Sequence, residues 1–138
     1  MSQDSDNPQA FIADLVARSR AAQKQIEHYS QEQVDALIRA MVWSVARPGV
    51  AEDIAQFAID ETQLGNYDGK FLKIQRKTRA TLLDIIDDKS VGVIEEYPER
   101  NIRLLAKPLG GIGALAPSTN PEATPVIKGI HAVKGRNS

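Results

Sequence analysis

The spacing of the apolar residues changes near Lys89, and this change limits the folds open to the 138-residue chain. Before Lys89 the apolar residues recur every three or four positions, which is typical of amphipathic helices. After Lys89, residues 91–97 and 101–107 have the composition of β-strands, and residues 98–100 form a turn between them. The sequence therefore predicts an α/β chain with a helical region at residues 1–89 and a β-hairpin at residues 90–108.

Four helices are predicted in the helical region, at about residues 8–27, 31–46, 50–64 and 68–87. The second is the clearest, because Ser30 and Gln33 form a capping-box pattern in front of a regular apolar stripe. Gly65-Asn66 is expected to end the third helix, since glycine adopts the left-handed conformation without steric cost. The fourth has a basic middle without interleaved aromatic residues, so we expect a solvated face and no nucleic-acid site. Its basic residues are Lys70, Lys73, Arg76, Lys77 and Arg79.

The predicted hairpin is too small to be stable by itself. Two strands alone are only marginally stable in water. Ile102, Leu104 and Ala106 alternate along the second strand to give a largely apolar face, and the sequence contains no obvious third strand of this type. We therefore expect the hairpin to pair with a further strand or with a partner chain.

Charge and composition exclude several classes of partner. The chain has 17 basic and 18 acidic residues, so it lacks the basic surface that nucleic acids require. No apolar run approaches the ~20 residues of a membrane span, and the first residues do not resemble a secretory signal, so we expect a cytoplasmic protein. The chain has no cysteine, and His28 and His131 lack neighbours at metal-ligand spacing. We therefore expect no nucleic acid, membrane or metal partner, and no cysteine nucleophile within these residues.

Residues 109–138 carry the strongest indication of a binding site. The apolar run at 112–116 predicts a buried strand, the sequence PSTNP at 117–121 predicts a turn, and a helix follows within 122–133. Small hydrogen-bonding side chains then lie at the carboxyl end of a strand and face the positive end of a helix. This arrangement suits a phosphate, a carboxylate or a developing oxyanion.

A second interpretation of the same turn is purely structural. Ser118, Thr119 or Asn120 could satisfy free backbone amides at the start of the following helix, as capping residues do. The residues alone leave both interpretations open.

The glycines before the turn resemble a cofactor motif only superficially. Residues 111–116 match the pattern G-x-G-x-x-[GA] of dinucleotide-binding turns. In that motif the glycines follow a strand and open a helix, whereas Gly111 and Gly113 precede and interrupt an apolar run. We therefore expect a chance match, with glycines that let a strand pack closely against other backbone.

The sequence GGIGALAPSTNPEATPVIKGIHAVKGRN at residues 110–137 resembles the CoA-acylating branch of the aldehyde dehydrogenase superfamily. That branch carries a G-x-I-x-x-x-x-P-[ST]-T-N-P turn and a helix that ends in K-G-R-N. The resemblance extends over nearly the whole chain and implies the N-terminal portion of a longer enzyme. It implies that residues 109–138 are the truncated start of a Rossmann-like nucleotide-binding domain, whose next strand begins at 135–138. The nucleophilic cysteine would lie beyond Ser138, so the 138 residues alone are predicted to be inactive.

The resemblance also implies a reaction and a set of binding residues. In the complete enzyme a cysteine thiolate attacks an aldehyde, hydride passes to NAD or NADP, and coenzyme A accepts the acyl group. The residues implied to lie against the nicotinamide cofactor are Leu115, Ala116, Pro117, Ser118, Thr119 and Asn120. An asparagine of this turn would stabilise the oxyanion. Matching by the flanking prolines selects Thr119 for this role, whereas matching by residue type selects Asn120, which we prefer as the catalytic candidate.

The resemblance also implies a particular substrate and a partner subunit. Residues 92–101 and 120–128 look closer to the members that act on sulfoacetaldehyde than to those that act on acetaldehyde. We therefore expect sulfoacetaldehyde as the small aldehyde substrate, with acetaldehyde second. The hairpin resembles the strands that join subunits, so the full-length protein is expected to be a homo-oligomer. A non-catalytic helical interaction module is the alternative from another class.

Overall fold

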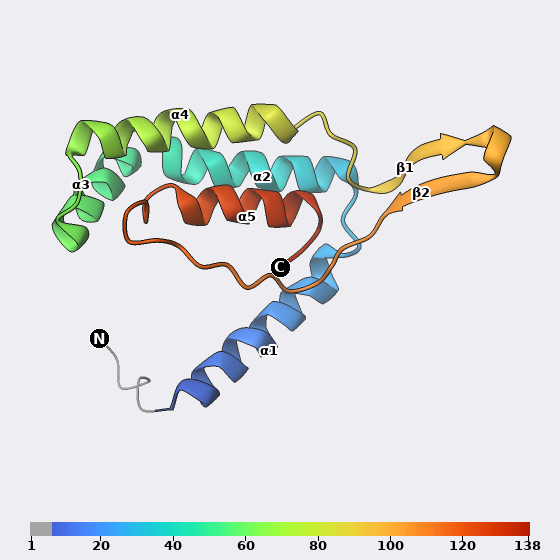
Figure 1. Ribbon diagram of the computed structural model, residues 1–138, viewed down its shortest axis with the longest axis horizontal. Coiled ribbons are helices and arrows are strands. Elements are labelled where there is room, and N and C mark those ends of the chain that lie inside the picture. The colour runs from blue at the N-terminus through green and yellow to red at the C-terminus, as the bar shows by residue number, and fades with distance from the viewer. Residues whose placement is uncertain (1–6) are drawn as a thin grey trace.

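The computed structural model describes residues 7–138, so residues 1–6 of the predicted helical region lie outside the described chain. Its elements follow the predicted order. They are α1 (Pro8–Ile26), α2 (Gln31–Ala46), α3 (Val50–Thr62), α4 (Tyr67–Ile85), β1 (Gly92–Tyr97), the 3₁₀ turn η2 (Pro98–Arg100), β2 (Ile102–Ala106) and α5 (Thr124–Lys134). The helices α2, α4 and α5 lie side by side, α3 packs near the start of α4, and the hairpin projects from the opposite end (Figure 1). The predicted α/β class is confirmed.

Local signals in the sequence set the starts of the helices. The Ser30 Oγ accepts a hydrogen bond from the Gln33 amide at 3.3 Å, and the Ser30 amide donates to Gln33 Oε1 at 2.9 Å. The predicted capping box of α2 is therefore present. Asn7 caps α1 in a similar way, because its Oδ1 accepts from the Ala10 amide at 3.0 Å.

The third helix ends earlier than predicted. It stops at Thr62, and the first residue behind it with positive φ is Gln63, at 55°, while the predicted Gly65 also has a positive φ, of 82°. The Thr62 hydroxyl donates to the Ala58 carbonyl at 2.6 Å and accepts from the Leu64 amide at 3.2 Å, so it turns the chain before the glycine. Asn66 belongs to the next helix, since its Oδ1 accepts from the amide of the third helical residue.

The helical core brings the end of the chain back onto its beginning. Ile38 and Val42 of α2 pack against Ile86, just after α4, and Ile130 of α5. A second cluster joins Ala51 and other small residues of α3 to α4. Each fully buried isoleucine contributes roughly 1.5–3 kcal/mol. These contacts fix α5 in place, and they hold the turn that precedes α5 next to the first half of α4.

The hairpin is a two-stranded antiparallel sheet, with Gly92 opposite Ala106 and Tyr97 opposite Ile102. Within residues 7–138 no third strand pairs with it. Its apolar side chains stay accessible, with Leu105 53% exposed. The hairpin therefore lacks, within the described residues, the additional strand that its predicted low stability requires.

The predicted buried strand at residues 112–116 is wrong for this chain. The segment is irregular and exposed, with Leu115 87% exposed. Its backbone makes one contact of the kind a strand makes, from the Ile112 amide to the Ser138 carbonyl at 2.7 Å. A strand requires a ladder of backbone partners, and none of the described residues supplies one to this segment.

The two glycines before the turn behave differently from each other. A Cβ added to Gly111 would lie 2.3 Å from Ser19 Oγ, whereas one added to Gly113 meets nothing within 4 Å. The expectation of close packing therefore holds for Gly111 alone, and its neighbour is a side chain rather than backbone. The helix after the turn begins at Thr124. In the described part of the chain, no helix combines the length and the apolar character that crossing a membrane requires.

Candidate functional site at the turn before α5

The PSTNP segment forms a tight turn above the first half of α4. The Asn120 amide donates to the Pro117 carbonyl at 3.2 Å, which closes the turn, and the Thr124 amide reaches the Asn120 carbonyl at 3.4 Å. None of its side chains caps α5, whose N-cap residue is Ala123 and which lacks a side-chain cap. The capping interpretation of Ser118, Thr119 and Asn120 is therefore not supported by the structure.

A buried ion pair connects this turn to α4. The Glu122 side chain has no exposed area, and the Lys70 side chain of α4 is 3% exposed. Their Nζ and Oε2 atoms lie 3.2 Å apart, and Lys70 also donates to the Thr119 carbonyl at 2.8 Å. A buried ammonium group is tolerated when it is paired in this way. The expectation that Lys70 belongs to a solvated face is therefore wrong.

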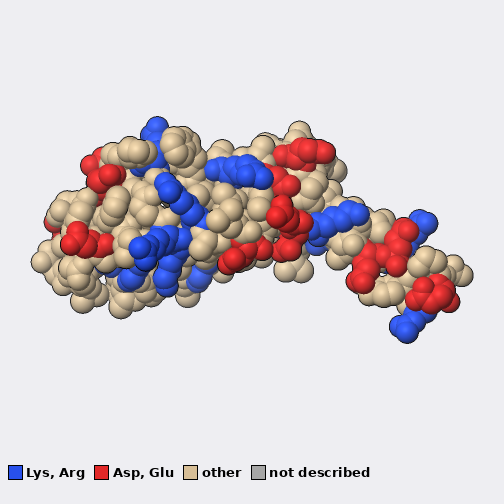
Figure 2. Space-filling model, turned by 90° about the horizontal axis from the view of Figure 1, so that it is seen from above, with Lys and Arg blue, Asp and Glu red and all other residues tan. Residues whose placement is uncertain are grey.

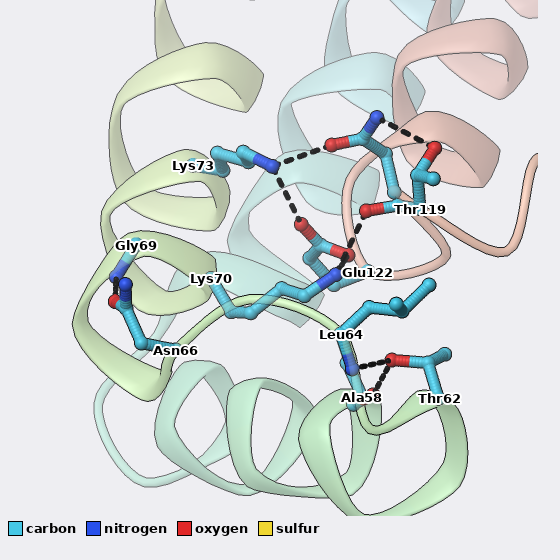
Figure 3. A network of polar contacts seen from close by, with 10 residues as sticks. Ala58, Thr62, Leu64, Asn66, Gly69, Lys70, Lys73, Thr119 and Glu122 are labelled. Carbon is cyan, nitrogen blue, oxygen red and sulfur yellow. Dashed lines mark hydrogen bonds and ion pairs between the residues drawn. The ribbon is translucent and has the colours of Figure 1, made fainter.

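A second lysine of α4 reaches the turn from its rim. Lys73 Nζ donates to Asn120 Oδ1 at 2.6 Å and lies 3.8 Å from Glu122 Oε1. It follows Lys70 by three residues, so both side chains leave the same side of the helix. Figure 3 shows Lys70 and Lys73 converging from α4 on Glu122.

The remaining basic residues of α4 agree with the prediction of a solvated face. Arg76, Lys77 and Arg79 are exposed. Figure 2 looks down on this side of the molecule and shows Lys and Arg side chains gathered over it. The difference in exposure between Lys70 and these three residues follows from the helical period. Lys70 precedes the buried Ile74 by four residues and therefore lies on the packed face.

The hydrogen bonds of Asn120 determine which part of its side chain is available. Its amide oxygen is taken by Lys73. Its amide nitrogen donates to Thr119 Oγ1 at 3.3 Å, which uses one of two N–H groups. The half-buried Asn120 side chain therefore has donor capacity left for an acceptor.

The other residues predicted to contact a cofactor lie on the accessible side of the segment. Leu115, Ala116, Pro117, Ser118 and Thr119 are all exposed. The Leu115 carbonyl accepts a hydrogen bond from Lys128 of α5. The six predicted residues thus form one consecutive segment that is exposed up to Thr119, but they border different cavities, Leu115 and Ala116 one, Ser118 a second and Thr119 a third.

Two cavities flank the turn, and their linings differ in charge. One, of about 380 Å³, lies toward the start of α4 and contains both lysines. Its lining residues are Leu64, Gly65, Asn66, Gly69, Lys70, Lys73 and Thr119. The other, of about 560 Å³, lies toward α3 and is lined mostly by apolar side chains such as Phe57, with the exposed Glu61 among them.

Sequence reasoning missed Lys70, Lys73 and Glu122 as members of the site. The spacing of Lys70 from Ile74 and Thr78 was an available signal, because it places the lysine on the apolar face of the helix. No comparable signal marks Glu122, since its partner stands 52 residues earlier in the sequence.

Comparison with known proteins agrees with the motif. No family model matches the chain. A sulfoacetaldehyde dehydrogenase of an Acholeplasma species is 41% identical over 128 residues, which are 93% of this chain and 26% of that protein. A succinate-semialdehyde dehydrogenase (acetylating) of Clostridium kluyveri is 42% identical over 127 residues, or 92% of this chain and 28% of that protein.

The fold gives the same result. The crystal structure of an acetylating aldehyde dehydrogenase from Geobacillus thermoglucosidasius superposes with a TM-score of 0.88 at 32% identity, over 94% of this chain and 28% of that one. The chain therefore spans about a quarter of the length of the relatives it matches. In both sequence and fold it is similar to the N-terminal region of acylating aldehyde dehydrogenases, and the resemblance inferred from the turn motif is confirmed.

Proposed function

We propose that this chain is the N-terminal part of a CoA-acylating aldehyde dehydrogenase that oxidises a short aldehyde to its acyl-CoA. The observation that carries the proposal is the turn at residues 117–121, which is held rigidly by a buried ion pair and yet leaves its side chains free of capping duty. The similarity to acylating enzymes over more than nine-tenths of the chain supports the same reaction.

We assign the nicotinamide cofactor, NAD or NADP, to the segment formed by residues 115–120. Small side chains and two prolines leave this backbone open to a flat ligand, and Ser118 and Thr119 offer hydroxyl groups there. When bound, the cofactor accepts the hydride that leaves the aldehyde carbon. Coenzyme A is assigned as the acyl acceptor, with no residue of this chain in contact with it.

Asn120 is the proposed donor to the oxyanion that develops on the aldehyde oxygen. Its amide oxygen is held by Lys73, and this leaves the NH₂ group with a free N–H. A preorganised donor of this kind stabilises developing negative charge without a cost of reorganisation during the reaction. Thr119 is the alternative, and its hydroxyl already accepts from Asn120.

The proposed substrate is sulfoacetaldehyde, with acetaldehyde second. Sulfoacetaldehyde dehydrogenases of Acholeplasma, Cupriavidus necator and Bilophila wadsworthia are 38 to 41% identical to this chain, and the bifunctional aldehyde-alcohol dehydrogenase of Escherichia coli is 30% identical. The succinate-semialdehyde dehydrogenase of Clostridium kluyveri, at 42%, is equally similar, so the preference rests on the number of sulfoacetaldehyde enzymes among these relatives. We further propose that the full-length protein is a homo-oligomer, because the exposed apolar face of the hairpin suits a partner subunit.

The test uses the full-length protein with sulfoacetaldehyde, NAD or NADP, and CoA. Reduction of the cofactor together with formation of the acyl-CoA is expected. Asn120→Ala should lower kcat by about 10²–10³-fold, a loss that a change in cofactor affinity alone would not produce. Thr119→Ala is the matched variant and should retain most of kcat, with its effect on the KM for the cofactor. Unchanged turnover of Asn120→Ala would reject the oxyanion role, and absence of cofactor reduction with every short aldehyde would reject the proposed function.

A further inference from the structure

We propose that Lys73 binds the negatively charged end of the aldehyde substrate in the cavity beside the turn, an inference that rests on the proposed dehydrogenase function. The substrate class that follows is a short aldehyde with a sulfonate or carboxylate group.

Two ammonium groups share one buried carboxylate at this place. Glu122 lies between Lys70 and Lys73, at 3.2 Å from the first Nζ and 3.8 Å from the second. Lys70 is almost fully buried and donates hydrogen bonds to Glu122 and to the Thr119 carbonyl. The cluster therefore carries an excess of one positive charge, and that charge resides on the more accessible Lys73, whose side chain is 37% exposed.

Lys73 faces a cavity that can take an anion. The cavity of about 380 Å³ is lined by no Asp or Glu side chain. Its wall includes Gly69 in the first turn of α4, where the helix dipole adds positive potential. An ammonium group has three N–H donors, and Lys73 uses one of them in the hydrogen bond to the Asn120 oxygen. Glu122 Oε1 lies 3.8 Å away, beyond hydrogen-bond distance, so donor capacity of Lys73 is available to a ligand.

The cavity on the α3 side of the turn is unsuited to the same group. Its lining includes the exposed Glu61, together with the apolar side chains of Phe57 and Leu64. An anion there would face the Glu61 carboxylate without a cation among the lining residues. The distribution of charge thus directs the anionic end of a ligand to the α4 side.

Lys73 also lies at a suitable distance from the proposed reaction centre for a short substrate. It contacts the oxygen of the Asn120 amide, and the NH₂ group at the other end of that amide is the proposed oxyanion donor. One amide group therefore separates the two recognition points. This short span matches an aldehyde in which one or two carbon atoms separate the carbonyl carbon from the anion.

The kinetic test compares a charged with a neutral aldehyde in the full-length protein. Lys73→Met should lower kcat/KM for sulfoacetaldehyde by about 10- to 100-fold more than that for propanal, the additional factor that one charge-assisted hydrogen bond supports. A loss common to both aldehydes reports the orientation of Asn120, which Lys73 also contacts. Lys73→Arg should recover part of the loss. Lys77→Met, an exposed residue of the same helix, is the control and should leave both substrates unaffected.

Two kinetic outcomes would overturn the proposal. An equal loss for both aldehydes would mean that Lys73 only positions Asn120. A rise in the KM for NAD or NADP, with the preference between aldehydes unchanged, would assign the positive charge to a cofactor phosphate instead.

Binding of an unreactive analogue separates this inference from the proposed function. Calorimetric titration with 2-hydroxyethanesulfonate should show binding to the unsubstituted protein and to Lys77→Met, and at least tenfold weaker binding to Lys73→Met. Equal binding to all three proteins, or no binding to any, would refute the role of Lys73. This result holds whether or not the protein reduces NAD, and a protein that binds the sulfonate through Lys73 but oxidises no aldehyde would refute the proposed function alone.

Discussion

Replacement of Lys70 by methionine tests whether the buried ion pair holds the candidate site together. In Lys70→Met the Glu122 carboxylate stays fully buried, and its remaining cation, Lys73, lies 3.8 Å away at the rim. At a separation of 3.2 Å the Lys70–Glu122 attraction is about 5 kcal/mol for an effective dielectric constant near 20. Much of it offsets the cost of burial, but removal of one partner exposes that cost.

The expected loss of stability is about 3–5 kcal/mol, which is a large fraction of the roughly 5–15 kcal/mol of a typical domain. Urea denaturation followed by circular dichroism measures it. The double variant Lys70→Met, Glu122→Leu removes both charges and should recover most of the loss, because a buried pair can be exchanged for apolar residues at little cost. Lys77→Met is the control in the same helix and should change stability by less than about 0.5 kcal/mol.

If Lys70→Met and Glu122→Leu each cost less than about 1 kcal/mol, and their effects add in the double variant, the two side chains do not depend on one another. The turn would then be held by the packing of α5 alone.

Three further predictions concern other parts of the chain. Ser30→Ala should cost about 1 kcal/mol in urea denaturation through loss of the capping box, and Ser30→Asp should not. Lys134→Met should cost about 2 kcal/mol, since it removes a 2.8 Å contact to Asp35, and Lys134→Arg should cost less. Hydrogen bonding to Glu95 raises the pKa of Tyr97 above its ordinary value of 10.0. This contribution to stability is therefore present below pH 10 and is lost as the pH rises through the raised pKa, and Glu95→Gln should lower that pKa in an ultraviolet titration.

Local signals were sufficient to predict most of the fold. Ser30 and Gln33 marked the start of α2 because their mutual hydrogen bonds involve residues three positions apart. The hairpin was predicted from two short runs and a turn containing Pro98, for the same reason. In each case the partners that stabilise the element lie within the sequence window in which the pattern is recognised.

Predictions failed where the stabilising partner is remote. Lys70 was assigned to a solvated face, and the groups that bury it, Thr119 and Glu122, come about fifty residues later. The apolar run at 112–116 has the composition of a buried strand, but composition cannot supply the neighbouring strands that a ladder needs. The site was therefore predictable as a turn of small polar residues, whereas the charges that define what it binds were not.

The K-G-R-N sequence at the end of α5, residues 134–137, identifies the family, but its side chains make structural contacts and not catalytic ones. Lys134 donates to the Ile86 carbonyl at 2.9 Å, and Arg136 donates to the carbonyls of Glu27 and Ala106. Asn137 Oδ1 accepts from two successive backbone amides, those of Leu109 and Gly110. These side chains join the ends of α1, α4 and the hairpin to the segment that leads into the turn.

Most of these contacts satisfy backbone groups at helix ends or in the segment after the hairpin, and the one to Ala106 reaches the last residue of β2. Such groups are costly to leave unpaired when buried. The most recognisable part of the motif is thus a set of structural ties. It follows that substitutions at Lys134, Arg136 or Asn137 should act on stability first, whereas those at Lys73 and Asn120 should act on substrate preference and turnover. The two classes of residue can therefore be told apart by the ratio of their effects on unfolding and on kcat/KM.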